Sequence, residues 1–246
     1  MSKDIYFVAK DQFGFDTQLK PYPASANVPQ WFKDEQPYEV NPENKKGKTL
    51  IVEDGSSNAS FKKCTPMLDG ITSGYIIPLW TDVQIRITPE GYQKITWRTQ
   101  QSPFDKHGDV FQKHGDSAAR VKPPVGYDKV FKYINTWIPK TPPGYSVMVS
   151  HPAGYEDVPF RAIPAIIDSD KSELELAFPM WLQEGFEGIV GKGTPMIQIT
   201  PFKRDSWTSH CVSYEGNEYQ KIQERNFNST IFNNYIKNHW TRKVYR

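Results

Sequence analysis

The sequence is poor in cysteine and has no long hydrophobic run. Its 246 residues include two cysteines, Cys64 and Cys211, which lie far apart and fit no spacing typical of metal ligands. Two such thiols are typical of reduced cysteines in a cytosol. No window approaches the roughly 20 apolar residues that a membrane-spanning helix needs. The first residues also form no apolar signal core. We therefore expect an intracellular protein without a membrane segment or a secretory signal.

The sequence also lacks a surplus of either charge. Its 30 basic and 28 acidic residues give a formal net charge of +2. Such a balance predicts no general binding to nucleic acid and none to an acidic membrane. Basic residues gather near the C-terminal end, as Lys237, Arg242, Lys243 and Arg246. This cluster is typical of a solvated helix end rather than of a phosphate-binding patch.

What the sequence does contain favours a mainly β fold. Aromatic residues make up 14%, enough to build a core, and 20 prolines and 16 glycines are scattered along the chain. This scatter is typical of many short strands joined by turns. The alternation of Val83, Ile85 and Ile87 with polar residues predicts a half-buried strand. Strands are predicted over 3–9, 75–80, 83–88, 93–98, 130–138, 145–150, 162–167, 173–178 and 196–202.

The predicted elements divide the chain into three regions. Residues 1–48 form a strand and an irregular N-terminal arm. Residues 49–207 form an antiparallel β-domain, interrupted over 99–128 by a long polar loop. Residues 208–246 form a helical extension of the same domain, because aromatic and aliphatic residues recur at helical spacing over 217–240 and proline is absent there.

Tryptophans lie in or beside the predicted strands, as Trp80, Trp97, Trp137 and Trp181. Aromatic side chains on strands can stack on nucleic-acid bases. The near-neutral charge predicts no electrostatic groove to hold a nucleic acid, however. We therefore expect these side chains to pack in the core or at subunit contacts.

Four segments follow one another in the order of the motifs of the dUTPase and dCTP deaminase family. They are residues 73–85, 142–154, 166–172 and 192–198. The resemblance implies a dUTPase-like antiparallel β-fold, which in that family is usually trimeric with sites between subunits. It also implies that Asp168 matches the family's water-activating aspartate and that Gln198 matches its glutamine. These two residues are the catalytic candidates, with Mg²⁺ as the metal that the family's chemistry would use.

Other positions depart from the family's pattern. Ile76 replaces the acid of the family's first motif. Pro152 and Ala153 replace the phosphate-gripping Arg-Ser pair of its second motif. Lys171 and Ser172 replace the base-stacking tyrosine and the arginine that follows it. Nucleotide hydrolysis needs cationic clamps on metal-bridged phosphates, so the resemblance implies a fold that has lost the reaction. Residues 168–170 are also typical of a β-turn capped by its own side chains.

A second chemical candidate is a pair of His-x-Asp units, His107/Asp109 and His114/Asp116. With His151 as the distal ligand, His107 and Asp109 would form the facial triad of a non-haem iron oxygenase. Gly-Asp beside His is also an ordinary turn sequence, and the units fall in the predicted polar loop. We therefore expect His107 and His114 to be exposed to solvent and not to face His151.

Most of the chain resembles a group of uncharacterised proteins encoded by tailed bacteriophages. The resembling segments are residues 29–33, 64–70, 74–83, 142–149, 186–190 and 201–204. The resemblance implies a phage origin, with a location in the host cytoplasm or the virion, but no activity.

We therefore expect a non-enzymatic phage protein, either a virion component or a host-interaction factor, with no cofactor. Its expected partners are further copies of itself or other phage or host proteins. Two alternatives remain open: a nucleotide-binding protein that retains the pocket, and a non-haem Fe(II)/2-oxoacid oxygenase that uses His107, Asp109 and His151.

Overall fold

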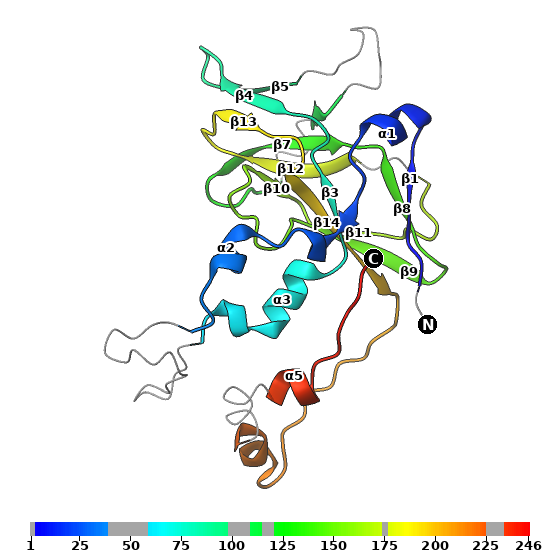
Figure 1. Ribbon diagram of the computed structural model, residues 1–246, viewed down its shortest axis with the longest axis vertical. Helices are drawn as coiled ribbons and strands as arrows, with labels where there is room; N and C mark the ends of the chain where they lie inside the picture. Colours follow the sequence, from blue (N-terminus) through cyan, green and yellow to red (C-terminus); the bar gives the residue numbers. More distant parts are fainter. Residues whose placement is uncertain (1–2, 39–58, 98–108, 115–120, 174–176, 225–233) are drawn as a thin grey trace, which may run out of the picture. The chain divides into compact units, whose positions relative to one another are not determined.

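The computed structural model describes residues 3–38, 59–97, 109–114, 121–173, 177–224 and 234–246 (Figure 1). Its strands form antiparallel sheets and its helices are few, which confirms the expectation of a mainly β protein. The chain divides into two compact units. Unit 1 comprises residues 1–26, 74–204 and 245–246, and unit 2 comprises residues 27–73 and 205–244.

The largest sheet of unit 1 has five strands in the order β11-β9-β14-β3-β2. The strands are β2 (Tyr22–Pro23), β3 (Tyr75–Pro78), β9 (Tyr145–Ser150), β11 (Ala165–Ile167) and β14 (Pro195–Lys203). The central strand β14 pairs antiparallel with β3 on one side and with β9 on the other. Its first five residues are all buried, because side chains on both faces of the strand are covered.

A second sheet has four antiparallel strands in the order β10-β12-β7-β6. They are β6 (Phe111–Lys113), β7 (Tyr127–Ile134), β10 (Phe160–Ala162) and β12 (Ala177–Gln183). The prediction of a polar loop throughout 99–128 is therefore wrong at β6. Phe111 lies opposite Tyr133 of β7 and is 5% exposed. Strand β6 forms because it pairs with β7, a non-local partner, and its polar local sequence did not indicate a strand.

Two smaller sheets complete unit 1. One pairs β1 (Tyr6–Ala9) with β8 (Trp137–Lys140), and the other has the order β13-β4-β5. Strands β4 (Val83–Ile87), β5 (Gln93–Trp97) and β13 (Gly188–Val190) are all antiparallel to their neighbours. The strands predicted over 83–88 and 93–98 are confirmed over 83–87 and 93–97, and residue 98 lies outside the described residues.

Two predicted strands are each divided in the structure. The strand expected over 130–138 is β7 and β8, which belong to different sheets. Between them, Asn135 Oδ1 accepts a hydrogen bond of 2.9 Å from Trp137 N, and Gln18 Oε1 accepts one of 2.9 Å from Thr136 N. Side chains thus occupy main-chain donors that a continuous strand would pair. The strand expected over 162–167 likewise divides into β10 and β11. Of the strand expected over 173–178, residues 174–176 lie outside the described residues, and Ala177 and Phe178 belong to β12.

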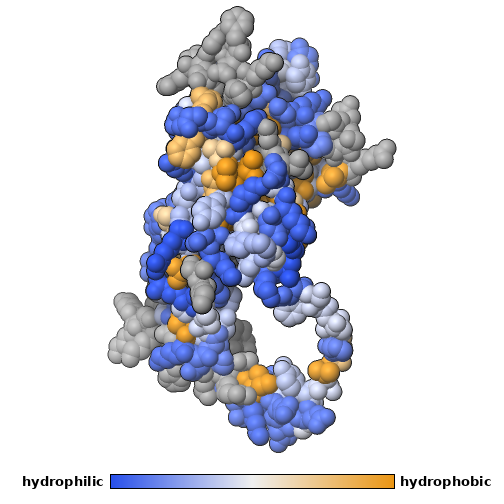
Figure 2. Space-filling model, turned by 90° about the vertical axis from the view of Figure 1, so that its right-hand side faces the viewer, coloured by the Kyte–Doolittle hydropathy of each residue, from blue (hydrophilic) through white to orange (hydrophobic). Residues whose placement is uncertain are grey.

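The core of unit 1 draws side chains from all four sheets. Its largest fully buried side chains include Tyr133, Phe160, Ile77, Ile85, Met180, Leu182 and Ile199. The hydroxyl of Tyr133 donates a hydrogen bond of 2.6 Å to the carbonyl oxygen of Pro78, and burial raises the pKa of this hydroxyl far above its ordinary value. In the view of Figure 2 the surface is largely hydrophilic, with hydrophobic residues in small patches.

The helices are short in both units. Unit 1 has α1 (Gln12–Thr17) and the 3-10 turn η1 (Ala24–Ala26), so the predicted irregular arm contains helical turns. Unit 2 has α2 (Gln30–Asp34), η2 (Phe61–Lys63), α3 (Thr65–Thr72), a helical stretch over 218–224 and α5 (Asn234–Asn238). The last two lie in the C-terminal region where helices are expected, whereas residues 205–215 form no helix. Among the described residues, no helix has the length and apolar character to cross a membrane.

Gly74, which precedes β3, lies so close to the backbone of β14 that a side chain would clash there. Its φ of 71° lies in the left-handed region, and an added Cβ would lie 2.0 Å from the carbonyl oxygen of Ile199 on β14. Gly74→Ala should therefore lower the free energy of unfolding by at least about 2 kcal/mol, measured by urea denaturation. Gly91→Ala is the matched control, since Gly91 has a φ of 81° but nothing within 4 Å of its Cβ position. That change should cost only about 1 kcal/mol, and equal losses for the two variants would contradict the close approach of β14 to β3.

Candidate functional site

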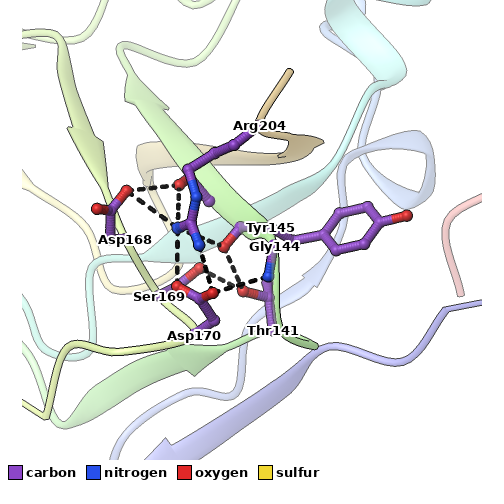
Figure 3. A network of polar contacts seen from close by, with 8 residues as sticks. Thr141, Gly144, Tyr145, Asp168, Ser169, Asp170 and Arg204 are labelled. Atoms are coloured by element: carbon purple, nitrogen blue, oxygen red, sulfur yellow. Dashed lines mark hydrogen bonds and ion pairs between the residues drawn. The ribbon is translucent and has the colours of Figure 1, made fainter. Parts of the chain in front are cut away.

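The most connected group of polar side chains in unit 1 surrounds the turn that follows β11 (Figure 3). The carbonyl oxygen of Asp168 accepts hydrogen bonds from Lys171 N at 2.9 Å and from Ser172 N at 2.8 Å. The predicted turn at 168–170 is therefore confirmed. Its two aspartates point toward Arg204, which directly follows β14.

Arg204 binds both aspartates. Its Nη1 lies 2.7 Å from Asp170 Oδ1, and its Nη2 donates to Asp170 Oδ2, so this pair is bidentate. Nη1 also lies 3.1 Å from Asp168 Oδ1. The Asp170 side chain is 4% exposed, whereas that of Asp168 is 55% exposed. Asp170 is thus the enclosed member of the cluster, and Asp168 reaches solvent.

Hydrogen bonds hold both carboxylates in the ionised form. The hydroxyl of Ser146 donates to Asp168 Oδ1 at 2.7 Å and lowers the pKa of Asp168, assisted by Arg204. The hydrogen bonds from Arg204 lower the pKa of Asp170 to about 2, assisted by Gly144 N, which lies 2.8 Å from Asp170 Oδ2. The cluster therefore joins the start of β9, the turn after β11 and the end of β14.

Gln198, the second residue suggested by the dUTPase-like resemblance, has different partners. Its side chain is buried on β14, and its Oε1 accepts a hydrogen bond of 2.9 Å from Ala153 N. Gln198 lies opposite Ser150 at the end of β9, whereas Asp168 contacts Ser146 near the start of that strand. Four residues of a strand span about 13 Å. The two catalytic candidates thus lie toward opposite ends of β9.

His151, the proposed distal metal ligand, follows β9 and is mostly buried. Its Nε2 lies 3.0 Å from the carbonyl oxygen of Tyr155, and its Nδ1 is buried without a hydrogen-bond partner among the described residues. Burial lowers the pKa of His151, so the ring is neutral at pH 7. Arg161, ten residues after His151, forms an ion pair with Glu156, in which Arg161 Nη1 lies 3.1 Å from Glu156 Oε2.

The other members of the predicted iron triad are only partly described. His107 lies outside the described residues. Asp109 is exposed, and its Oδ2 accepts a hydrogen bond of 3.1 Å from Gln112 Nε2. Asp109 and Gln112 line a cavity of about 250 Å³ beside α1, together with Lys10, Asp11 and Asn135. In the described part of the chain, no three His, Cys, Asp or Glu side chains converge as metal ligands.

His114 does not lie in the solvent-exposed loop that the sequence predicts. It follows β6, and its main-chain N donates to the carbonyl oxygen of Val130 at 3.2 Å, which continues the pairing with β7. The residue is half-buried and its Nδ1 is enclosed. The expectation of an exposed His114 is therefore wrong, because it depended on the absence of a strand at this position.

Sequence reasoning missed a larger groove in unit 1. It has a volume of about 530 Å³ and is lined by Tyr92, Gln93, Lys94, Ile95, Trp97, Phe111, Lys113, Lys129 and Phe131. Its residues come from β5, β6 and β7, and from the β4–β5 turn, which contributes Tyr92. The available signal was the i, i+2 spacing of Lys129 and Phe131, which places both side chains on one face of β7. Because residues 99–128 were predicted to be a polar loop, β6 and its side of the groove were not predicted.

The pH dependence of unfolding tests the Asp170–Arg204 pair. Asp170 has a pKa of about 2, below the ordinary value near 3.9. Its ionised form therefore stabilises the fold above pH 4, and this stability is lost as pH falls from about 4 through 2. Asp170→Asn should lower the urea midpoint at pH 6 and flatten its decline between pH 4 and 2. Asp128→Asn, an exposed change on β7, should keep the steep decline. An unchanged profile in Asp170→Asn would contradict this assignment.

Comparisons with known proteins do not place the chain in a family. No protein-family model matches it, and no curated protein and no solved structure matches it either. The resemblances to the dUTPase family and to tailed-phage proteins remain predictions from the motifs quoted above. The contacts of Asp168, Gln198 and Arg204 are the observations from which a function can be argued.

Proposed function

We propose that this chain is a non-catalytic bacteriophage protein, a virion component or a host-interaction factor, on a dUTPase-like β-fold that has lost hydrolysis. The observation that supports this proposal best is the Arg204 cluster. At the turn where the resembling family keeps its water-activating aspartate, this chain has an ion cluster that joins three strand ends. The residues that would perform chemistry hold the sheet together instead.

The chemistry of Asp168 agrees with a structural role. A general base works best when its pKa lies near the operating pH. Here the hydrogen bond from Ser146 and the nearby Arg204 lower the pKa of Asp168 below its ordinary value. A carboxylate that already accepts these hydrogen bonds is a weak base toward water. Its contacts stabilise the turn and leave it poorly suited to activate a nucleophile.

The segment that follows β9 provides a second argument. In the resembling family this segment grips phosphate, which requires hydrogen-bond donors or cations. Pro152 has no N–H, and the N–H of Ala153 is bonded to Gln198 at 2.9 Å. The Ala153 hydrogen bond therefore ties the segment after β9 to β14. A phosphate at these two positions would find no free main-chain donor.

Exposed apolar side chains in unit 2 favour a binding role. Trp207 and Val212 are each 90% exposed, Tyr214 is 60% exposed and Tyr219 is 53% exposed. Aromatic residues of this kind are enriched among the residues that dominate protein–protein binding. Such side chains suit contacts with another copy of the chain, or with a phage or host protein.

Incubation with nucleotides tests the loss of hydrolysis. The purified full chain, supplied with dUTP or dCTP and Mg²⁺, should release no pyrophosphate above the protein-free background. Asp168→Asn should leave that background unchanged and lower the urea midpoint of unfolding, because its role is structural. Turnover near 1 s⁻¹, an ordinary enzyme rate, that disappears in Asp168→Asn would overturn the proposal. Stoichiometric iron in the purified protein would favour the oxygenase alternative instead.

A further inference from the structure

Two strand faces meet across the groove beside β5. Gln93, Ile95 and Trp97 alternate along β5, so their side chains share one face of it. On the facing wall, Lys113 of β6 lies directly opposite Phe131 of β7. Lys129 lies two residues before Phe131 and therefore shares its face. The groove thus has aromatic rings along both walls, with Lys113 and Lys129 on the β6–β7 side.

The floor and one end of the groove are held in place by ring contacts. Phe111 stacks on Phe160 with ring centroids 4.5 Å apart, and its ring lies 5.6 Å from that of Tyr133. At the β4–β5 turn, the half-exposed ring of Tyr92 lies 5.8 Å from Lys129 Nζ, within reach of a cation–π contact. The aromatic surface is therefore preorganised and accessible at Tyr92.

The groove lining combines aromatic rings with positive charge and contains no negative charge. Of its nine residues, four are aromatic, three are lysines and none is acidic. The net charge of +2 for the whole chain does not reveal that this lining holds lysines and no acidic side chain. A ligand that fits must offer flat rings to the aromatic side chains and negative charge to the lysines.

We propose that this groove binds a short segment of single-stranded nucleic acid, with bases stacked on Tyr92, Trp97 and Phe131 and phosphates near Lys113 and Lys129. Proteins that bind single strands combine a positively charged groove with aromatic side chains on which bases stack. An acidic peptide would bring negative charge to the lysines but would leave the aromatic side chains without stacking partners. This inference goes beyond the proposed function and does not depend on whether the chain hydrolyses nucleotides.

Titration of a fluorescently labelled oligothymidylate with the full chain, followed by anisotropy, tests the phosphate contacts. The double variant Lys113→Gln/Lys129→Gln should weaken binding at least about tenfold. The slope of log K against log salt should also fall by about 1.4, since each phosphate contact on a single strand contributes about 0.7. Lys20→Gln is the matched control, because Lys20 Nζ lies 4.5 Å from the Phe15 ring centroid, outside the groove. It should bind like the unmodified chain.

A second pair of variants tests base stacking. Tyr92→Ala should weaken oligothymidylate binding by about fivefold or more, as expected for the loss of one stacked base. Tyr6→Ala removes a tyrosine that is 64% exposed on β1, outside the groove, and should leave binding unchanged. The urea midpoint of each variant shows whether it folds. If the lysine double variant fails to fold, Tyr92→Ala still tests the groove.

Further titrations distinguish the ligands. Oligothymidylate should bind more tightly than dTTP, than a duplex of equal length and than polyglutamate. Three outcomes would overturn the proposal: no saturable binding of the single strand at low salt, equal binding of duplex or polyglutamate, or equal losses in the groove variants and their controls.

Discussion

The pairing of β14 with both β3 and β9 is the constraint on which the rest of unit 1 depends. Because β14 is central, its buried residues pack on both faces of the sheet. The close approach of Gly74 to Ile199 fixes β14 against β3 on one side. On the other side, Gln198 holds the segment after β9 and Arg204 holds the turn after β11. Strand β14 and the residue that follows it therefore hold both catalytic candidates of the dUTPase-like motifs, because Gln198 lies on the strand and Arg204 binds Asp168.

Local pattern predicted much of this fold, and non-local contacts account for what it missed. The alternation of Val83, Ile85 and Ile87 was sufficient to predict β4, since a half-buried strand leaves that period in its own residues. Strand β6 has no such pattern, and its existence depends on the pairing of Phe111 with Tyr133. The division of 130–138 depends on the side chains of Asn135 and Gln18, which compete for main-chain donors.

The candidate site was predictable to the same limited extent. The turn at Asp168 follows from residue types that favour turns. Its partner Arg204 lies 34 residues away from Asp170, and no spacing rule connects them. The groove was harder still, since its lysines and rings come from three strands and one of these was not predicted. Total charge measured over a whole chain is a poor guide to a surface of nine residues.

The division of the chain has a consequence for the entropy of loop closure. Unit 2 consists of two excursions, residues 27–73 and 205–244, and each leaves unit 1 and returns to it. The second return is anchored where the ring of Tyr75 lies 5.9 Å from that of Tyr245 and the Tyr75 hydroxyl donates to the Arg246 carbonyl. Once the strands of unit 1 have paired, both loops are closed and the entropic cost of closure has been met. A peptide of either excursion alone would lack these closed ends and would have to meet the entropic cost of closure by its own contacts.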